Sequence, residues 1–545
     1  ERGRRQKAHA ERKETLSTKV IRGKKKEKNS FAEIIAGVME YIVAMVLVVM
    51  VFAVAFYAKE GYYQIGSAKF DAYRRVMLPG MALLLVMELV YLIGGIRGKA
   101  GKGRSVTDWF VLAYLALTVV SALCGGCRED ALWGSRGWNM GMMAQFSFVL
   151  LYFFVSRFGR WYRSIVAALG AASFVVFGIG ILHRMLIDPI GYYEGLTYEQ
   201  KAQFLSTLGQ ATWYASFLIV LLPVGAAVFL YSEKRYERVL SGIWLTFGIA
   251  TLVTQNSDSA YVAFFGCMLV FLWDAAQRRE TLLRYAEICT GFWGIGRIMG
   301  FLLQIRPNPA FEPDVVSQVV LCSAWGWAFL AAGVVCCVIL LCRREKGEYP
   351  QAWMRRARNA VYAVTGAGLL FSVVVLVWGA AGELPAALGG LTWKISYLRW
   401  GDDWGNARGR IWTFAAQVFR EESLWNKLCG VGPDCLNSYV KANYAQELTL
   451  LWGEKTLTNA HNEWFTMLIN GGIMGLAAYA GIFVTLTGRC MKRKDENYLL
   501  IGVAAAVVSY MAYNFFCYQQ VLCTPFVFLW MGIGEYLLRR AKNEG

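Results

Sequence analysis

The chain has 545 residues, of which 57% are hydrophobic and only 17% are charged. A soluble protein of this length would carry more charge, so a string of soluble domains is excluded. The net charge of +18 would suit a nucleic-acid-binding protein. Apolar runs long enough to cross about 30 Å of hydrocarbon nevertheless recur along the whole chain. We therefore expect an all-α polytopic membrane protein with no nucleic-acid partner.

Residues 1–30 form a basic, hydrophilic tail without apolar periodicity, with Arg4, Arg5 and Lys24 among its charges. Such tails are typically disordered and cytoplasmic, and they contact anionic membrane lipid. The apolar run that follows is long and lacks a clear cleavage site, so we expect no removable secretory signal.

Hydropathy predicts about fourteen membrane spans after this tail. The approximate ranges are 34–57, 76–96, 108–125, 138–156, 164–183, 212–231, 240–255, 259–275, 287–305, 318–342, 360–379, 462–487, 498–518 and 522–538. With the N-terminus inside, most Lys and Arg residues of the connections fall on the cytoplasmic side. An even number of spans then places the C-terminus in the cytoplasm as well.

The same map divides the chain into a transmembrane bundle (31–379), a large outer loop (380–461), and C-terminal helices with a short cytoplasmic tail (462–545). Loops as long as 380–461 usually have a function. A smaller outer segment spans 184–211. We expect any active site between these two segments and the outer helix ends.

His461 stands where the large loop enters a membrane helix, inside the polar cluster Asn459–Glu463. The other histidines are His9 and His183. A helix N-terminus disfavours the imidazolium and attracts anions, so a neutral ring could accept a proton there. Alternatively, His461 is an interfacial residue with a hydrogen bond and no catalytic role.

Two arginines of the outer loop, Arg408 and Arg410, lie among glycines and suit a diphosphate or an acidic sugar. Alternatively, they pair with Asp402 and Asp403 at a solvated helix start.

Further along, Gly471 and Gly475 have the spacing of two small residues on one helix face. This spacing predicts the close approach of a neighbouring helix.

In their order and position, these motifs resemble the O-antigen ligase and polymerase family of integral membrane glycan-transfer enzymes. The family pattern of His-Asn, nine residues, Gly, two residues, Gly is complete in His461–Gly475. Arg408–Trp412 matches Arg, three residues, Trp, and Gly430–Gly432 matches a later Gly-x-Gly segment. Thr207–Ala215 is similar to the family's Gly-Asn-x-Asn-x-x-Ala turn.

The resemblance implies a GT-C-like helical bundle that transfers a glycan from an undecaprenyl diphosphate carrier to a hydroxyl of a glycan or glycolipid acceptor. The reaction would occur outside the bacterial cytoplasmic membrane, with inversion and without metal or cofactor. His461 would be the base, and Arg408 with Arg410 would bind the leaving diphosphate. Asn462 and Glu463 would orient His461 or the acceptor.

The chain departs from the family at Gln255–Tyr261, where many members have Ser-Arg-Gly-Ala and Asp258 replaces the arginine. Arg297, inside an apparent span, is our candidate for the missing donor-binding charge, because intramembrane arginines are costly and usually have a reason. Alternatively, the span boundary is misplaced.

Two other functions stay open. A repeat-unit polymerase of the same family would use the same motifs. A transporter is less favoured, because no clear internal repeat is visible and the polar residues gather in one loop.

Three close cysteine pairs fall near the predicted outer face, namely Cys124 with Cys127, Cys429 with Cys435, and Cys517 with Cys523. Disulfides within these pairs are left open, and we expect no catalytic role for the thiols.

Overall fold

The structure is a computed structural model that describes residues 33–93, 103–342, 350–453 and 457–544. Within these ranges the chain is almost entirely helical, and its strands are the antiparallel pair β1 (Phe204–Leu205) and β2 (Gly209–Gln210). Nine helices of the described ranges are long and apolar enough to cross a membrane. The all-α polytopic fold is thus confirmed, whereas the count of about fourteen spans stays a prediction.

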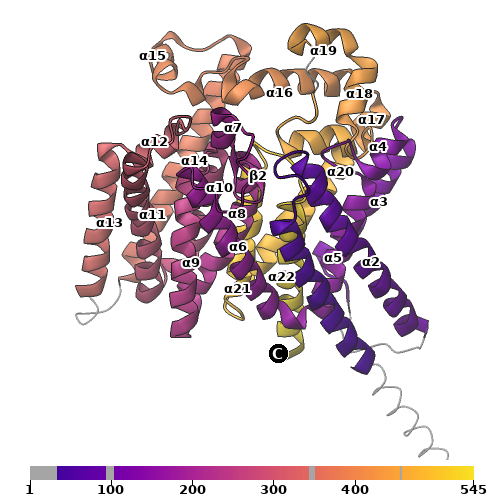
Figure 1. Ribbon diagram of the computed structural model, residues 1–545, viewed down its shortest axis with the longest axis horizontal. Helices are drawn as coiled ribbons and strands as arrows, with labels where there is room; N and C mark the ends of the chain where they lie inside the picture. Colours follow the sequence, from indigo (N-terminus) through magenta and orange to yellow (C-terminus); the bar gives the residue numbers. More distant parts are fainter. Residues whose placement is uncertain (1–32, 94–102, 343–349, 454–456, 545) are drawn as a thin grey trace, which may run out of the picture.

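The long helices form one bundle (Figure 1). In chain order they are Glu33–Phe56, α2 (Ile65–Ile93), α3 (Val106–Cys124), α5 (Met142–Phe158), α6 (Tyr162–Arg184), α8 (Ala211–Tyr231), α9 (Arg235–Thr254), α10 (Asp258–Ala275), α11 (Arg279–Ile305), α13 (Ala324–Cys342), α14 (Gln351–Ala381), α20 (Glu463–Lys492), α21 (Leu499–Tyr513) and α22 (Thr524–Glu544). Short helices between them are α4 (Arg128–Trp133), η1 (Gly159–Trp161), α7 (Tyr198–Gln203) and α12 (Val315–Leu321). Each predicted span overlaps one long helix.

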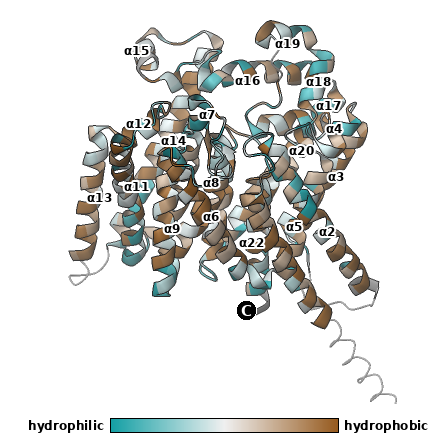
Figure 2. Cartoon of the chain, in the orientation of Figure 1, coloured by the Kyte–Doolittle hydropathy of each residue, from teal (hydrophilic) through white to brown (hydrophobic). Residues whose placement is uncertain are grey.

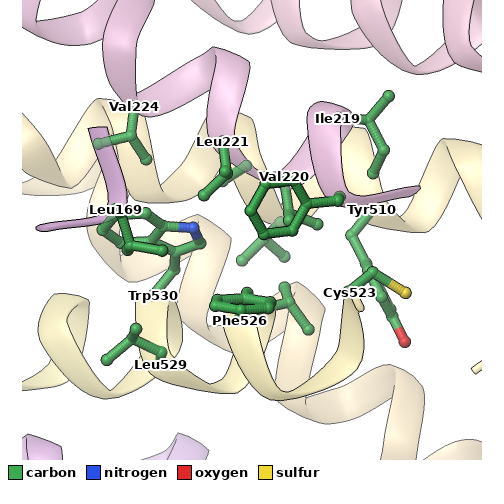
Figure 3. Close-up of a cluster of buried hydrophobic side chains, with 14 of the residues drawn as sticks. Leu169, Ile219, Val220, Leu221, Val224, Tyr510, Cys523, Phe526, Leu529 and Trp530 are labelled. Carbon is green, nitrogen blue, oxygen red and sulfur yellow. The ribbon is translucent and has the colours of Figure 1, made fainter. Parts of the chain in front are cut away.

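The centre of the bundle is built around α8, in which every residue from Tyr214 to Val224 is buried. Helix α21 packs against α8 and α10, and α22 packs against α5. Figure 3 shows side chains from several of these helices meeting, among them Leu169, Val220, Tyr510 and Phe526. A helix that is apolar all round and buried belongs to the interior of a bundle.

Helices α13 and α14 are apolar but exposed, and α13 is brown along most of its length in Figure 2. The buried residues of α13 are Gly326 and Leu340. An apolar surface without protein cover suits hydrocarbon surroundings, as in a membrane.

Charged residues close the end of the bundle where α3 begins. Arg539 pairs with buried Asp108 at 2.6 Å, and Arg489 pairs with buried Glu535 at 2.5 Å. Because a charge buried without a partner is costly, these pairs fix the relative positions of α3, α20 and α22.

The opposite end, here called the loop end, carries the segment between α14 and α20 (Figure 1). This segment is folded into α15 (Ala386–Lys394), η3 (Ser396–Leu398), α16 (Trp404–Glu421), α17 (Leu424–Cys429), α18 (Leu436–Asn443) and α19 (Ala445–Trp452). Phe414, Val418 and Val440 form part of its own apolar cluster, which also includes Ala122 of α3. The segment therefore packs on the bundle through a core of its own.

Candidate functional site

His461 lies in the turn that precedes α20, with a backbone φ of +46°. Its N–H donates a hydrogen bond to Asn459 Oδ1 at 2.8 Å, and its ring meets the Tyr518 ring edge-on at 5.3 Å between centroids. Burial lowers the pKa of His461 to about 4, and the nearby positive charge of Arg408 acts in the same direction. The ring is therefore neutral at neutral pH and can accept a proton.

Arg408 follows a left-handed turn at the start of α16, in which Gly405, Asn406 and Ala407 have φ values of 57°, 61° and 66°. Non-glycine residues rarely adopt this conformation, and it clusters at functional sites. Arg408 Nε donates to the carbonyl of Phe516 at 3.0 Å, and Nη1 donates to the carbonyl of Gly405. These two bonds hold the guanidinium near His461.

Asn462 is the N-cap of α20. Its side chain accepts the N–H of Phe465 at 3.0 Å, which satisfies one of the free donors of the first turn. The residue therefore fixes where the helix begins, directly after His461.

Glu463, the first residue of α20, is buried. Its carboxylate accepts hydrogen bonds from Tyr510 at 2.9 Å and from the side chains of Tyr479 and Asn514. Among the described contacts, neither Glu463 nor Asn462 reaches the His461 ring with its side chain. Both act instead on the helix start that carries the ring.

The glycines after His461 have a different role from the expected helix contact. Gly472 has a φ of +68° and breaks the regular path of α20. The carbonyls of Ile469 and Asn470 accept the N–H groups of Val431 and Gly432 at 3.1 and 3.0 Å. The two glycine motifs of the sequence thus meet backbone to backbone and fasten the loop-end segment to α20.

The expected Gly471 and Gly475 pair does not make this approach. A Cβ atom on Gly475 would meet nothing within 4 Å, and one on Gly471 would meet only the sulfur of Met467, at 3.3 Å. The close approach falls instead at Gly472, where a Cβ would stand 2.6 Å from the amide nitrogen of Cys429. The spacing of the glycines in the sequence did not show whether they serve helix packing or a break in the helix.

Tyr518 connects His461 to the start of α8, which belongs to the stretch that is similar to the family's turn. Trp213 Nε1 donates to the Tyr518 hydroxyl at 3.1 Å, and Trp138 meets the Tyr518 ring edge-on at 4.4 Å. Sequence reasoning missed Tyr518, because no motif marks the turn between α21 and α22.

A cavity lies beside Asn459, Glu463 and Tyr518, which are neighbours of His461. Its lining is largely apolar and also includes the polar residues Gln145, Asp434, Asn470 and Gln519 and the aromatic Trp138. Amide and carboxyl groups beside aromatic rings can bind a hydroxylated ligand by hydrogen bonds and ring contact.

Asp434 anchors one wall of this cavity. Its Oδ2 accepts the N–H groups of Ser135 at 2.8 Å and Met140 at 3.0 Å. Burial raises the pKa of Asp434 to about 7, although both N–H donors act in the opposite direction. The carboxyl group therefore joins the turn after α4 to the segment between α17 and α18.

Two further predicted site residues have other partners. Arg410 pairs with Asp402 at 3.2 Å and donates to the carbonyl of Leu451 at 3.1 Å. Arg297, well inside α11, donates to the carbonyls of Ser323 and Val319 at 2.8 and 3.0 Å. Arg408 lies close enough to His461 for its charge to lower the pKa of the ring, whereas no described contact links Arg297 to either residue.

Asp258, which stands where the resemblance led us to expect an arginine, begins α10. Its carboxylate accepts the Tyr397 hydroxyl and, at 3.4 Å, the N–H of Val316. It therefore joins α10 to η3 and α12.

Residues 315–480 match the family model described as O-Antigen ligase. The match contains Arg408, Arg410, His461, Asn462 and Glu463, but not Arg297. No curated protein matches the chain. The chain is therefore a multi-pass membrane protein in which residues 315–480 are similar to the O-antigen ligase family.

Proposed function

We propose that the chain transfers a glycan from an undecaprenyl diphosphate carrier to an acceptor hydroxyl on the outer face of the bacterial cytoplasmic membrane. Both termini would then lie in the cytoplasm and the loop end outside. The observation that carries the proposal is the neutral His461 beside Arg408 at the start of α20, inside the segment that matches the ligase family.

In the proposed step, the acceptor oxygen attacks the anomeric carbon of the glycan while the bond from that carbon to the carrier diphosphate breaks. His461 takes the proton of the acceptor hydroxyl. Arg408 binds the diphosphate and stabilises the charge that grows on it. Attack opposite the leaving group inverts the anomeric centre, and the diphosphate ester supplies the driving force.

Burial and the charge of Arg408 disfavour the imidazolium of His461. A bound diphosphate would bring negative charge beside both groups and would favour the protonated ring. Donor binding would thereby make His461 a stronger base when the acceptor arrives.

Arg410 supports the proposal as a second arginine on the same helix, although its pair with Asp402 would have to open. Arg297 donates to two backbone carbonyls, and its part in binding the donor stays a prediction.

Purified protein in lipid vesicles, supplied with an undecaprenyl diphosphate-linked glycan and a separate glycolipid acceptor, tests the proposal. We expect release of the carrier diphosphate, an inverted linkage by NMR, and an unchanged rate in EDTA. Longer glycan still attached to the carrier would identify a polymerase instead. Bound donor without release under all conditions would contradict both enzymes and favour a transporter.

A further inference from the structure

Cys127 and Cys435 lie together at the loop end, although they belong to segments far apart in the chain. Cys435 Sγ lies 3.6 Å from the carbonyl oxygen of Cys127, and the two thiols interact directly. The sequence suggested Cys124 with Cys127 and Cys429 with Cys435. The structure instead brings together one member of each of these pairs, and both are free thiols there.

We propose that Cys127 and Cys435 form a disulfide bond that fastens the turn after α3 to the segment between α17 and α18. The proposal relies on the proposed function only for placing the loop end outside the cytoplasm, where disulfides persist.

Hydrogen bonds already hold the two segments in register around these thiols. Ser135 Oγ donates to the carbonyl of Asp434 at 2.8 Å, and the Ser438 hydroxyl donates to the Asp130 carboxylate. The Asp434 carboxylate also accepts the N–H group of Ser135. These bonds hold the residues that follow Cys127 against residues on both sides of Cys435, so the two thiols are kept close to each other.

The other cysteines of the loop end have different neighbours. Cys517 Sγ lies 3.7 Å from Ser259 Oγ, and Cys523 Sγ lies 3.7 Å from the carbonyl of Gln520. Cys429 is buried where its backbone meets Gly472. Cys127 is the sulfur neighbour of Cys435 in the described part of the chain.

The bond would form by exchange with a disulfide-bearing oxidant. Cys127 is half-buried and Cys435 is fully buried, so the Cys127 thiolate attacks the oxidant first and forms a mixed disulfide. The Cys435 thiolate then attacks the Cys127 sulfur and displaces the oxidant's remaining sulfur. The pair loses two protons and two electrons, and the oxidant's disulfide becomes two thiols.

Burial raises the pKa of both thiols, and Asp130 adds to the effect at Cys127. Because the thiolate is the attacking species, exchange in the folded protein should be slow.

The bond would hold a wall of the candidate site. Pro433 and Asp434 line the cavity beside Tyr518, and Gly432 bonds to α20 at its break. Fixing Cys435 limits how far this wall can move from the turn after α3.

Differential thiol labelling tests the inference. Cells are lysed in denaturant with light N-ethylmaleimide, the protein is reduced, and new thiols receive the heavy reagent before mass spectrometry. We expect heavy label on Cys127 and Cys435. In the Cys127→Ser variant, Cys435 should carry the light label. In the matched control Cys429→Ser, both Cys127 and Cys435 should still carry the heavy label.

Light label on both residues in the wild type would overturn the inference. Heavy label that comes from a Cys124–Cys127 or a Cys429–Cys435 disulfide would overturn it as well. Glycan transfer is measured separately in the vesicle assay. If glycan transfer is observed while both thiols are free, only the disulfide proposal is refuted. If the disulfide is found but no transfer occurs, only the proposed function is refuted.

Discussion

The backbone of Gly472 lies directly against that of Cys429, so that a Cβ on Gly472 would stand 2.6 Å from the Cys429 nitrogen. Its φ of +68° also disfavours any side chain. We predict that Gly472→Ala destabilises the protein by about 1–3 kcal/mol through strain and overlap. Thermal unfolding in detergent measures the change.

Gly475→Ala is the matched control, because a Cβ there meets nothing within 4 Å. It should leave the melting temperature unchanged or slightly higher, since alanine favours a helix over glycine. Equal losses in the two variants would contradict the account of the break in α20.

His461→Ala should abolish transfer in the vesicle assay, because the proposed step then lacks the group that takes the acceptor proton. The protein should still insert and unfold at its usual temperature. His9→Ala, the same change in the N-terminal tail, should keep full activity. Activity in His461→Ala would refute the base assignment.

Arg408→Ala should reduce kcat by about 10²–10³-fold, as expected when a group that stabilises developing charge is removed. Arg410→Ala should reduce kcat by a smaller factor, because Arg410 already pairs with Asp402. Steady-state kinetics with the lipid-linked donor decide between them. A larger loss of kcat in Arg410→Ala than in Arg408→Ala would indicate that the diphosphate binds nearer to Arg410 and Asp402.

The ring of His461 should titrate near pH 4, below its ordinary pKa of 6.5, in the donor-free protein. Arg408→Gln should raise that pKa, because it removes a positive charge. Histidine-selective NMR can follow the ring, with His461→Gln identifying its signal. A wild-type value near 6.5 would show that the ring is neither buried nor beside Arg408.

The same shift affects stability in a defined pH window. Between about pH 6.5 and about pH 4 the unfolded chain binds a proton at His461 and the folded chain does not, so stability falls as the pH falls. His461→Gln should remove this part of the acid sensitivity. Thermal unfolding in detergent at about pH 7 and about pH 5 compares the two proteins. The same loss of stability in both would assign the acid sensitivity to other groups.

Much of the fold followed from the sequence, because long apolar runs such as 212–231 admit few alternatives to a buried helix, and α8 spans Ala211–Tyr231. The position of His461 at a helix start was also predictable, since Asn462 is a typical N-cap. Helix starts such as Arg279 in α11 were missed, because charged first turns lower the hydropathy of a window.

The partners within the site were less predictable. The proximity of Arg408 and His461 was expected only from the family resemblance. Tyr518 and the meeting of Cys127 with Cys435 depend on how distant segments pack, and no local pattern encodes that packing.

The contacts of Asp258 could not be predicted from the sequence motif either. Comparison with the family motif indicates only a lost donor contact at this position. The contacts of its carboxylate with Tyr397 and Val316 are structural, and they depend on helices that the motif does not include.

Asn470 shows when the site can be completed. Its carbonyl accepts Ser121 Oγ at 2.7 Å across 349 positions of sequence, as well as the N–H of Gly432. During synthesis, the end of α3 therefore cannot form this hydrogen bond until most of the chain has been made. A chain released before Asn470 would contain the helices up to α14 but would lack α20, α21, α22 and an assembled site, so such products should be inert toward lipid-linked sugar.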